Sequence, residues 1–238
     1  MGTHRNRRQR ERLVMTIQDV VVEARTDAYA PVRAVTNRGD VECRYYPAEE
    51  ARKAALWVPG AIGGWHSPAH DLYVRLCHEF GEEGIASLQV RYRDPHRLEE
   101  SALDVLAGVA FLESRGAEAI ALVGHSFGGA VAIQAAAAAP AVRCVVTLAT
   151  QSYGTETVGQ LGERCPILLI HGTDDPILPP GSSEHVYEMA QEPRRLLIYE
   201  GAGHNLDEVA EPVYLAVRDW ITLWLNTALS GAPASAGE

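Results

Sequence analysis

The stretch AIALVGHSFGGAVAIQAAAAAP (residues 119–140) decides how this chain folds. Its first six residues form an apolar run of the kind found in strands that are covered on both faces. Its last part is rich in alanine, favours a helix and is stopped by Pro140. Between them lies GHSFGG (124–129), whose glycines permit a tight turn. The sequence therefore predicts a buried strand, a sharp turn and a helix, with Ser126 at the turn.

The same alternation of short apolar runs and longer helical patterns continues on both sides of this stretch. We expect strands at 19–24, 41–46, 54–58, 85–92, 119–124, 142–149, 166–172 and 194–200. We expect helices at 69–83, 98–115, 127–139, 182–191 and 207–228. Repeated strand–helix–strand units predict an α/β fold: a mostly parallel central sheet of about eight strands with helices on both faces. The first strands are expected to form an antiparallel edge.

No linker or internal repeat divides the chain, so we expect one α/β domain over residues 19–228. Residues 1–18 begin with the arginine-rich segment MGTHRNRRQRER and are expected to be a disordered basic arm. Two interpretations of this arm stay open. Either it contacts nucleic acid or membrane, or it is translated from a start codon upstream of the true start at Met15. Residues 229–238 are small and polar, and are expected to be a flexible tail.

Composition excludes several classes of protein. The 238 residues are 47% apolar and 22% charged with a formal net charge of −10, which excludes wholesale disorder and argues against a general nucleic-acid binder. No apolar run reaches the ~18 residues of a membrane helix, and no signal peptide is evident, so we expect no membrane partner and a cytoplasmic location. The only lysine, Lys53, follows no glycine-rich loop, which excludes a P-loop. The four cysteines show no CxxC pairing and are expected to be reduced: Cys43, Cys77, Cys144 and Cys165.

Ser126 has the setting of a nucleophile, because a serine on a strand-to-helix turn is presented beside the positive end of the helix dipole. Such a serine needs a base, and the base needs a carboxylate that orients it. Asp175 and His204 each follow an expected strand, in HGTDDP (171–176) and GAGHN (201–205). The order Ser, Asp, His is that of α/β-hydrolases rather than of other serine hydrolases. Asp174 is the alternative acid.

On these residues the sequence resembles the α/β-hydrolase superfamily, and within it the cap-less serine esterases similar to dienelactone hydrolase, over about residues 19–225. The motifs that carry the resemblance are VPGAIGG (58–64), GHSFGG (124–129), HGTDDPILP (171–179) and GAGHNL (201–206). It implies Ser126 as nucleophile, Asp175 as the acid and His204 as the base.

Two backbone amides are expected to form an oxyanion hole, the site that stabilises the negative oxygen of the tetrahedral intermediate. The amide of Phe127 is the first. The resemblance implies that the second lies in the loop after strand 54–58, where Pro59 leaves a choice between Ala61 and Ile62, and we expect Ala61.

Only residues 150–165 join the strand after the nucleophile helix to the next strand, which leaves no room for a cap domain. We therefore expect an open site. The predicted function is that of a serine hydrolase without metal or cofactor, cleaving carboxylic esters of small or exposed acyl groups through an acyl-enzyme on Ser126. The alternatives are a thioesterase, peptidase or acyltransferase with the same triad, or a non-catalytic ligand-binding homologue. The expected partner is a small-molecule ester, and no oligomeric state is predicted.

Other polar and aromatic residues carry weaker hypotheses. His66 and His70 have the spacing of helical metal ligands, but Pro68 lies between them and no third ligand is evident, so no zinc site is expected. His125 and His171 are interpreted as scaffold residues. The basic residues after strand 85–92 would either contact an anionic substrate or form salt bridges: Arg91, Arg93, His96 and Arg97. The aromatic residues near the loops would either line a pocket or pack against the fold: Trp65, Tyr73 and Tyr153.

Overall fold

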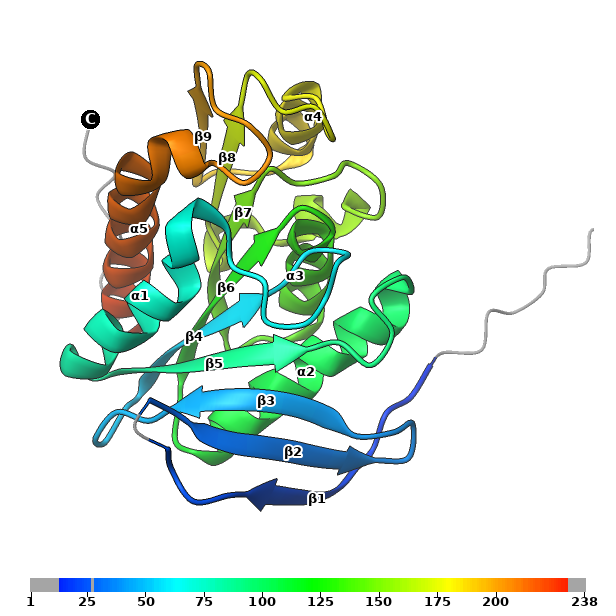
Figure 1. Ribbon diagram of the computed structural model, residues 1–238, viewed down its shortest axis with the longest axis vertical. Helices are drawn as coiled ribbons and strands as arrows, with labels where there is room; N and C mark the ends of the chain where they lie inside the picture. Colours follow the sequence, from blue (N-terminus) through cyan, green and yellow to red (C-terminus); the bar gives the residue numbers. More distant parts are fainter. Residues whose placement is uncertain (1–12, 27, 231–238) are drawn as a thin grey trace, which may run out of the picture.

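A nine-stranded sheet runs through the computed structural model, which describes residues 13–26 and 28–230 (Figure 1). The strand order across the sheet is β1-β2-β3-β5-β4-β6-β7-β8-β9. The strands are β1 (Ile17–Val22), β2 (Ala30–Thr36), β3 (Val41–Tyr46), β4 (Lys53–Val58), β5 (Ile85–Arg91), β6 (Ala119–His125), β7 (Val142–Leu148), β8 (Ile167–Gly172) and β9 (Arg194–Tyr199).

The sheet is parallel from β5 to β9, and β1, β2 and β3 add an antiparallel edge. The predicted α/β class is thereby confirmed, with one strand, β2, that was not expected. Its sequence APVRAVT alternates between the core and the other face, so Val32 and Ala34 are buried while Arg33 is exposed. Pro31 argues against a strand that is paired on both sides, yet it is accommodated one residue from the start of β2.

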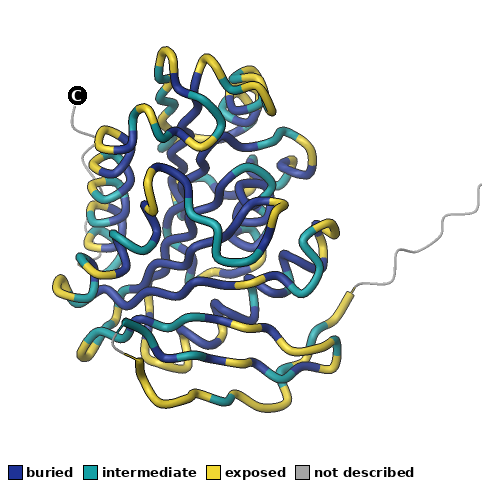
Figure 2. The backbone as a smooth tube through the Cα atoms, in the orientation of Figure 1, coloured by how far each residue is buried: buried dark blue, intermediate teal, exposed yellow. Residues whose placement is uncertain are grey.

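Helices cover both faces of the sheet (Figure 1). One face packs against α1 (Pro68–Glu82) and α5 (Ala210–Ser230), the other against α2 (Leu98–Ser114), α3 (Phe127–Ala138) and α4 (Gly181–Met189). The central strands carry apolar side chains into both layers, and Figure 2 shows them as a continuous buried band. This two-sided burial explains why their sequences read as unbroken apolar runs.

Between β7 and β8 the chain forms only two short 3₁₀ helices, η1 (Glu156–Gln160) and η2 (Gly162–Arg164). A third, η3 (Asp207–Val209), precedes α5. No cap domain therefore stands over the carboxyl edge of the sheet in the described residues, as predicted. Residues 1–12 and 231–238, which hold most of the predicted arm and tail, lie outside the described residues, and α5 itself continues to Ser230. None of the helices that the structure describes has the length and hydropathy that a membrane crossing requires.

Candidate active site

Ser126 stands at the turn between β6 and α3, at the carboxyl edge of the parallel strands. Its backbone has φ 56° and ψ −120°, a conformation that residues other than glycine rarely adopt. The turn is held because Ser126 N donates to Leu148 O at 2.8 Å and Gly129 N donates to Ser126 O at 3.0 Å. A strained serine that its neighbours hold in place is the arrangement expected of a nucleophile elbow.

At two glycines of the turn, other backbone atoms lie where a side chain would begin. A Cβ on Gly124 would lie 2.1 Å from Gly128 O, and a Cβ on Gly128 would lie 2.3 Å from Pro59 O. Both distances are far inside van der Waals contact, and the atoms met are backbone oxygens of the turn itself and of the neighbouring β4–α1 loop. These close approaches explain why the motif needs glycine at both positions.

Asp175 and His204 meet at the same edge of the sheet, from the loops that follow β8 and β9. His204 Nδ1 lies 2.7 Å from Asp175 Oδ2, and the Asp175 side chain is fully buried. Because a carboxylate only accepts, Nδ1 carries the proton and Nε2 of His204 is left as an acceptor. The alternative acid, Asp174, is exposed and accepts a hydrogen bond from Thr173 Oγ1 at 2.9 Å instead.

The carboxylate of Asp175 is stabilised as an anion. Burial acts to raise its pKa, but hydrogen bonds from His204 and from the amides of Leu178 and Ile177 outweigh burial and leave the pKa below its ordinary value. The two amides donate to Oδ1 at 2.9 and 2.8 Å respectively. Asp175 therefore stays ionised beside His204 at neutral pH, as an orienting carboxylate must.

His171, interpreted from the sequence as a scaffold residue, contacts the same carboxylate. Its Nε2 lies 3.1 Å from Asp175 Oδ2 and 3.0 Å from Leu178 O, and its Nδ1 lies 2.7 Å from Ser183 Oγ. Both oxygens at Nε2 are acceptors, so Nε2 carries the proton and the Ser183 hydroxyl donates to Nδ1. His171 thus contacts the same oxygen of Asp175 that His204 contacts. The sequence signal was its place one residue before the end of an expected strand, which does not distinguish such a role.

His125, the residue before Ser126, contacts His204 directly. Its ring centroid lies 4.8 Å from that of His204, and its Nε2 donates to the carbonyl oxygen of His204 at 3.0 Å. Its Nδ1 is buried and has no hydrogen-bond partner among the described residues. Burial lowers the pKa of His125 to about 4, so the ring is neutral at neutral pH. His125 therefore links the nucleophile turn to the loop that carries His204.

The loop that carries His204 is also held from α1. Ala69, His70 and Asp71 have φ between 48° and 60°, a left-handed conformation that non-glycine residues rarely adopt. This turn lets Ala69 N donate to Asn205 O at 2.8 Å and His70 N donate to Asp207 Oδ1 at 3.1 Å. The strained start of α1 therefore positions the residues that follow His204.

The hydroxyl of Ser126 makes no hydrogen bond with any described residue. The structure joins His204 to Asp175 and joins Ser126 to His204 only through the intervening His125. A loose contact between nucleophile and base is common in structures without substrate, and the contact tightens when substrate binds. Ser126 is partly exposed at this edge, so substrate can reach it.

Ala61 and Phe127, the expected oxyanion donors, flank Ser126. Phe127 is the first residue of α3, so its amide is among those that a helix leaves without an intrahelical acceptor. Ala61 follows Gly60, whose Cβ position lies only 3.5 Å from Ser126 Cβ. Gly63 N donates to Gly60 O at 2.9 Å and closes a turn around Ala61 and Ile62. The β4–α1 loop therefore passes beside the serine, as an oxyanion loop must.

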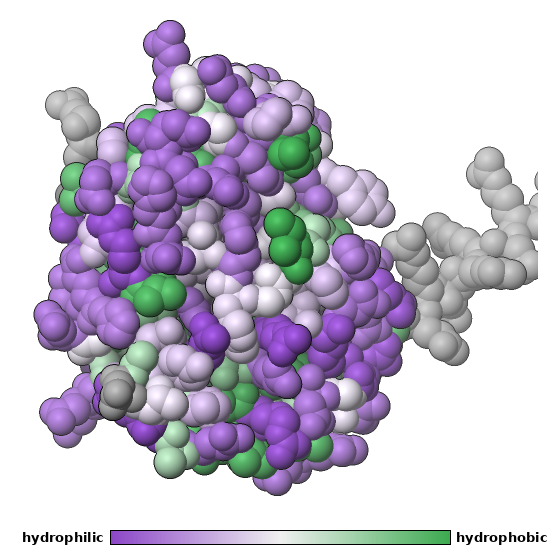
Figure 3. All heavy atoms as spheres, in the orientation of Figure 1, coloured by the Kyte–Doolittle hydropathy of each residue, from purple (hydrophilic) through white to green (hydrophobic). Residues whose placement is uncertain are grey.

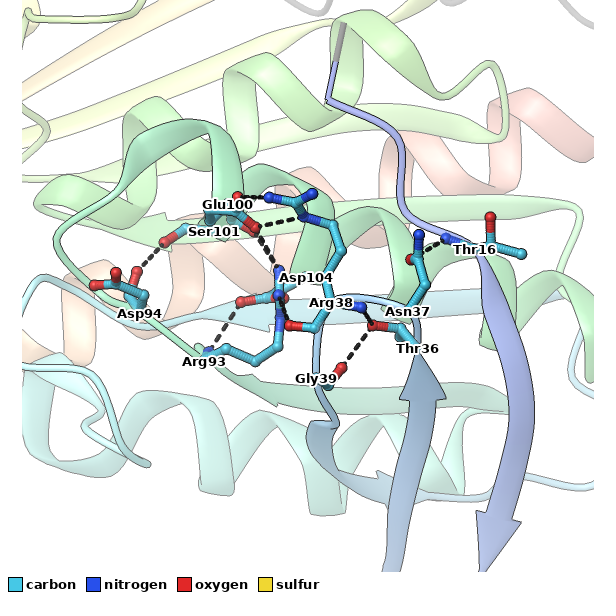
Figure 4. A network of polar contacts seen from close by, with 10 residues as sticks. All are labelled: Thr16, Thr36, Asn37, Arg38, Gly39, Arg93, Asp94, Glu100, Ser101 and Asp104. Atoms are coloured by element: carbon cyan, nitrogen blue, oxygen red, sulfur yellow. Dashed lines mark hydrogen bonds and ion pairs between the residues drawn. The ribbon is translucent and has the colours of Figure 1, made fainter. Parts of the chain in front are cut away.

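The basic residues after β5 are engaged with carboxylates. Figure 4 shows the guanidinium of Arg93 between Glu100 and Asp104, with Arg38 bound to the other side of Glu100. Arg91 pairs with Glu42 at 2.6 Å. For Arg91 and Arg93, the salt-bridge alternative therefore describes the structure. His96 and Arg97 are exposed.

The three aromatic candidates have different surroundings. The guanidinium carbon of Arg44 lies 4.2 Å from the ring centroid of Trp65. Tyr73 is buried, and its hydroxyl donates to Val58 O at 3.1 Å. Tyr153 is 77% exposed. Among the histidines with metal-ligand spacing, His66 lies against His125 and His70 is exposed. No three histidine, cysteine or carboxylate side chains in the described ranges gather closely enough to hold a metal ion.

Comparison with known proteins agrees with this fold. Residues 61–219 match the model of the dienelactone hydrolase family. A dienelactone hydrolase from Anabaena variabilis superposes with a TM-score of 0.69 at 19% identity, over 82% of this chain and 98% of that one. Est1E from Butyrivibrio proteoclasticus superposes with a TM-score of 0.68 at 16% identity, over 87% of this chain and 99% of that one. The esterase Pf2001 from Pyrococcus furiosus superposes with a TM-score of 0.67 at 17% identity, over 86% of this chain and 100% of that one. No curated protein matches the sequence.

Proposed function

The chain belongs to the dienelactone hydrolase family, and from that premise and the geometry of the site we propose that it is a serine hydrolase of carboxylic esters. The observation that carries the proposal is the hydrogen bond from His204 Nδ1 to the buried carboxylate of Asp175, at the edge where the elbow presents Ser126. A histidine oriented in this way has a free Nε2 with which to take the proton of a serine.

In the proposed reaction, the Oγ of Ser126 attacks the carbonyl carbon of the ester while His204 Nε2 takes the hydroxyl proton. The tetrahedral intermediate then breaks its carbon–oxygen bond to the alcohol, which leaves with the proton from His204. Water then attacks the acyl-enzyme and gives a proton to His204 Nε2. As the carbon–oxygen bond to Ser126 breaks, His204 returns this proton to Ser126 Oγ, and the acid leaves. Asp175 orients the imidazole and stabilises it while it is charged.

The negative oxygen of each intermediate is assigned to the amides of Phe127 and Ala61. Support comes from the helix start at Phe127 and from the close passage of the β4–α1 loop beside Ser126. One such donor is typically worth roughly 10²–10³ in rate. Backbone donors tolerate changes of side chain, so replacing Ala61 with serine is compatible with activity.

The absence of a cap over this edge in the described residues favours small esters, or esters whose acyl group stands out from a larger molecule. We assign the protein to the cytoplasm, because all four cysteines are buried free thiols, as expected in a reducing compartment.

Hydrolysis of p-nitrophenyl acetate tests the proposal. Ser126→Ala and His204→Gln are each expected to reduce kcat by roughly 10⁴-fold or more, and Asp175→Asn by a comparable or smaller factor. The matched control is Ser182→Ala, which removes a hydroxyl from α4. Wild-type turnover by folded Ser126→Ala would rule out the proposed nucleophile.

A further inference from the structure

The three most exposed large hydrophobic side chains that the structure describes come from loops at the edge of the sheet that carries Ser126. The most exposed large hydrophobic residues that the structure describes are Ile62 at 85%, Tyr153 at 77% and Ile177 at 66%. They come from three separate loops, after β4, β7 and β8, and all three loops lie at the carboxyl edge of the sheet (Figure 1). Figure 3 shows hydrophobic atoms standing apart among polar ones on the face that includes these loops.

Sheet order places these loops on both sides of the nucleophile. Ser126 follows β6, which lies between β4 on one side and β7 and then β8 on the other. With neighbouring strands about 4.8 Å apart, the strand ends that carry Ile62 and Tyr153 are separated by about 10 Å. A substrate bonded to Ser126 therefore lies between the loop that carries Ile62 and the loops that carry Tyr153 and Ile177.

Each of these residues lies in or beside a hydrogen-bonded turn, and that of Ile177 involves Asp175 itself. Ile62 is in the turn closed by Gly63 and Gly60, and Ile177 N donates to Asp175 Oδ1 at 2.8 Å. Beside Tyr153, Gln134 Nε2 from α3 donates to Gly154 O at 2.9 Å. The loop tips are thus presented by hydrogen-bonded turns, so little ordering is needed when a ligand covers them.

We propose that Ile62, Tyr153 and Ile177, the apolar rim, bind the hydrophobic acyl or alcohol group of the ester substrate. This inference rests on the proposed function, because the rim is a substrate site only if Ser126 is acylated. It narrows the substrate class to esters with a medium-length alkyl or an aromatic group that lies along the edge of the sheet. Each methylene buried against the rim is worth up to about fourfold in kcat/KM.

Charge and area favour a substrate group over larger occupants. Exposed Asp174 and Glu156 lie within three residues of Ile177 and Tyr153, and the whole chain carries a net charge of −10, which disfavours an anionic membrane surface. A stable protein interface buries about 800 Å² on each partner. Three side chains that stand apart among polar residues do not provide such an area.

The test compares kcat/KM for p-nitrophenyl acetate, butyrate and octanoate in the wild type, in Ile62→Ser, Tyr153→Ser and Ile177→Ser, and in the triple variant. Leu215→Ser is the matched control, because Leu215 is 46% exposed on α5. In the wild type, the octanoate-to-acetate ratio is expected to be tenfold or more. Each single substitution should lower this ratio about three- to tenfold, mainly through KM, and the triple variant should lower it further. Leu215→Ser should leave the ratio within twofold of the wild type.

Other outcomes overturn the inference. An unchanged ratio in the triple variant, with hydrolysis still dependent on Ser126, would reject the rim and leave the proposed function standing. Cosedimentation of the wild type, but not of the triple variant, with phosphatidylcholine vesicles would identify a lipid surface instead. A wild-type dimer that the triple substitution dissociates would identify a second copy. If folded wild type cleaves none of the esters and does not react with a fluorophosphonate, the proposed function fails and the rim fails with it.

Discussion

Lowering the pH from 7 to 5 should destabilise this protein through His125, one residue from the candidate nucleophile. The buried ring donates from Nε2 to His204 O, while its buried Nδ1 has no partner among the described residues. A proton added at Nδ1 would therefore create a buried charge without a hydrogen-bond acceptor. Burial accordingly lowers the pKa of His125 from its ordinary 6.5 to about 4.

The sign and size of the effect follow from this pKa. Between pH 6.5 and pH 4 the unfolded chain holds the proton at His125 and the folded chain does not, so the free energy of unfolding falls as the pH falls. His125 makes its full contribution to the free energy of unfolding above pH 6.5, and this contribution is lost by about pH 4. One pKa unit corresponds to about 1.4 kcal/mol, so the loss between pH 7 and pH 5 is about 2 kcal/mol.

Urea unfolding at pH 7 and pH 5 measures this loss, with His125→Gln as the comparison because glutamine keeps a donor and does not titrate. The wild type should lose about 2 kcal/mol more than His125→Gln over this interval. Groups that titrate elsewhere cancel in the difference. Equal losses in the two proteins would refute the reasoning and show that His125 is protonated as readily in the folded chain as in the unfolded one.

Three further predictions concern the residues that support the site. Gly128→Ala, whose new Cβ would lie 2.3 Å from a backbone oxygen, should lower the free energy of unfolding by about 2–3 kcal/mol. Gly81→Ala, which meets nothing within 4 Å on a helix, should be neutral or stabilise by up to about 1 kcal/mol; equal effects in urea would contradict the geometry. His171→Leu removes one donor from Asp175, so kcat should fall about tenfold or more with KM within twofold, and the acid limb of the pH–rate profile should shift upward; an unchanged profile would leave His171 only a packing role. Glu100→Gln keeps one acceptor but removes the charge, and it should lower the free energy of unfolding by about 1.5–3 kcal/mol in urea at pH 7, because hydrogen bonds from Arg38 and Arg93 hold the pKa of this carboxylate at about 2; a loss below 1 kcal/mol would show that the network is not a stabilising one.

The parallel half of the sheet was predictable because its strands are buried on both faces and read as apolar runs. The antiparallel edge was less so: β2 contains Pro31 and Arg33, and its pairing with β1 and β3 depends on contacts that a local pattern does not show. The meeting of Ser126, Asp175 and His204 at one edge was predictable because each lies in the turn or loop that follows a strand, and parallel strands end at one edge.

The supporting contacts of the site were not predictable from local sequence. His171 and His125 act through hydrogen bonds to Asp175 and to His204 O, and His204 lies 79 residues from His125 in the chain. Likewise, nothing in a helical pattern predicts the left-handed turn at 69–71, which the loop after β9 holds in place. Local patterns indicated where the chemistry lies, whereas the packing between loops determined which neighbours position it.

Mass spectrometry of the native protein after treatment with a fluorophosphonate tests the central claim most directly, because the reagent phosphonylates a serine only where a base activates it. We expect one adduct per chain, on the peptide that contains Ser126, with little or none in His204→Gln and none in Ser126→Ala. A folded wild type that stays unmodified, or an adduct that persists on another serine when Ser126 is alanine, would contradict the account.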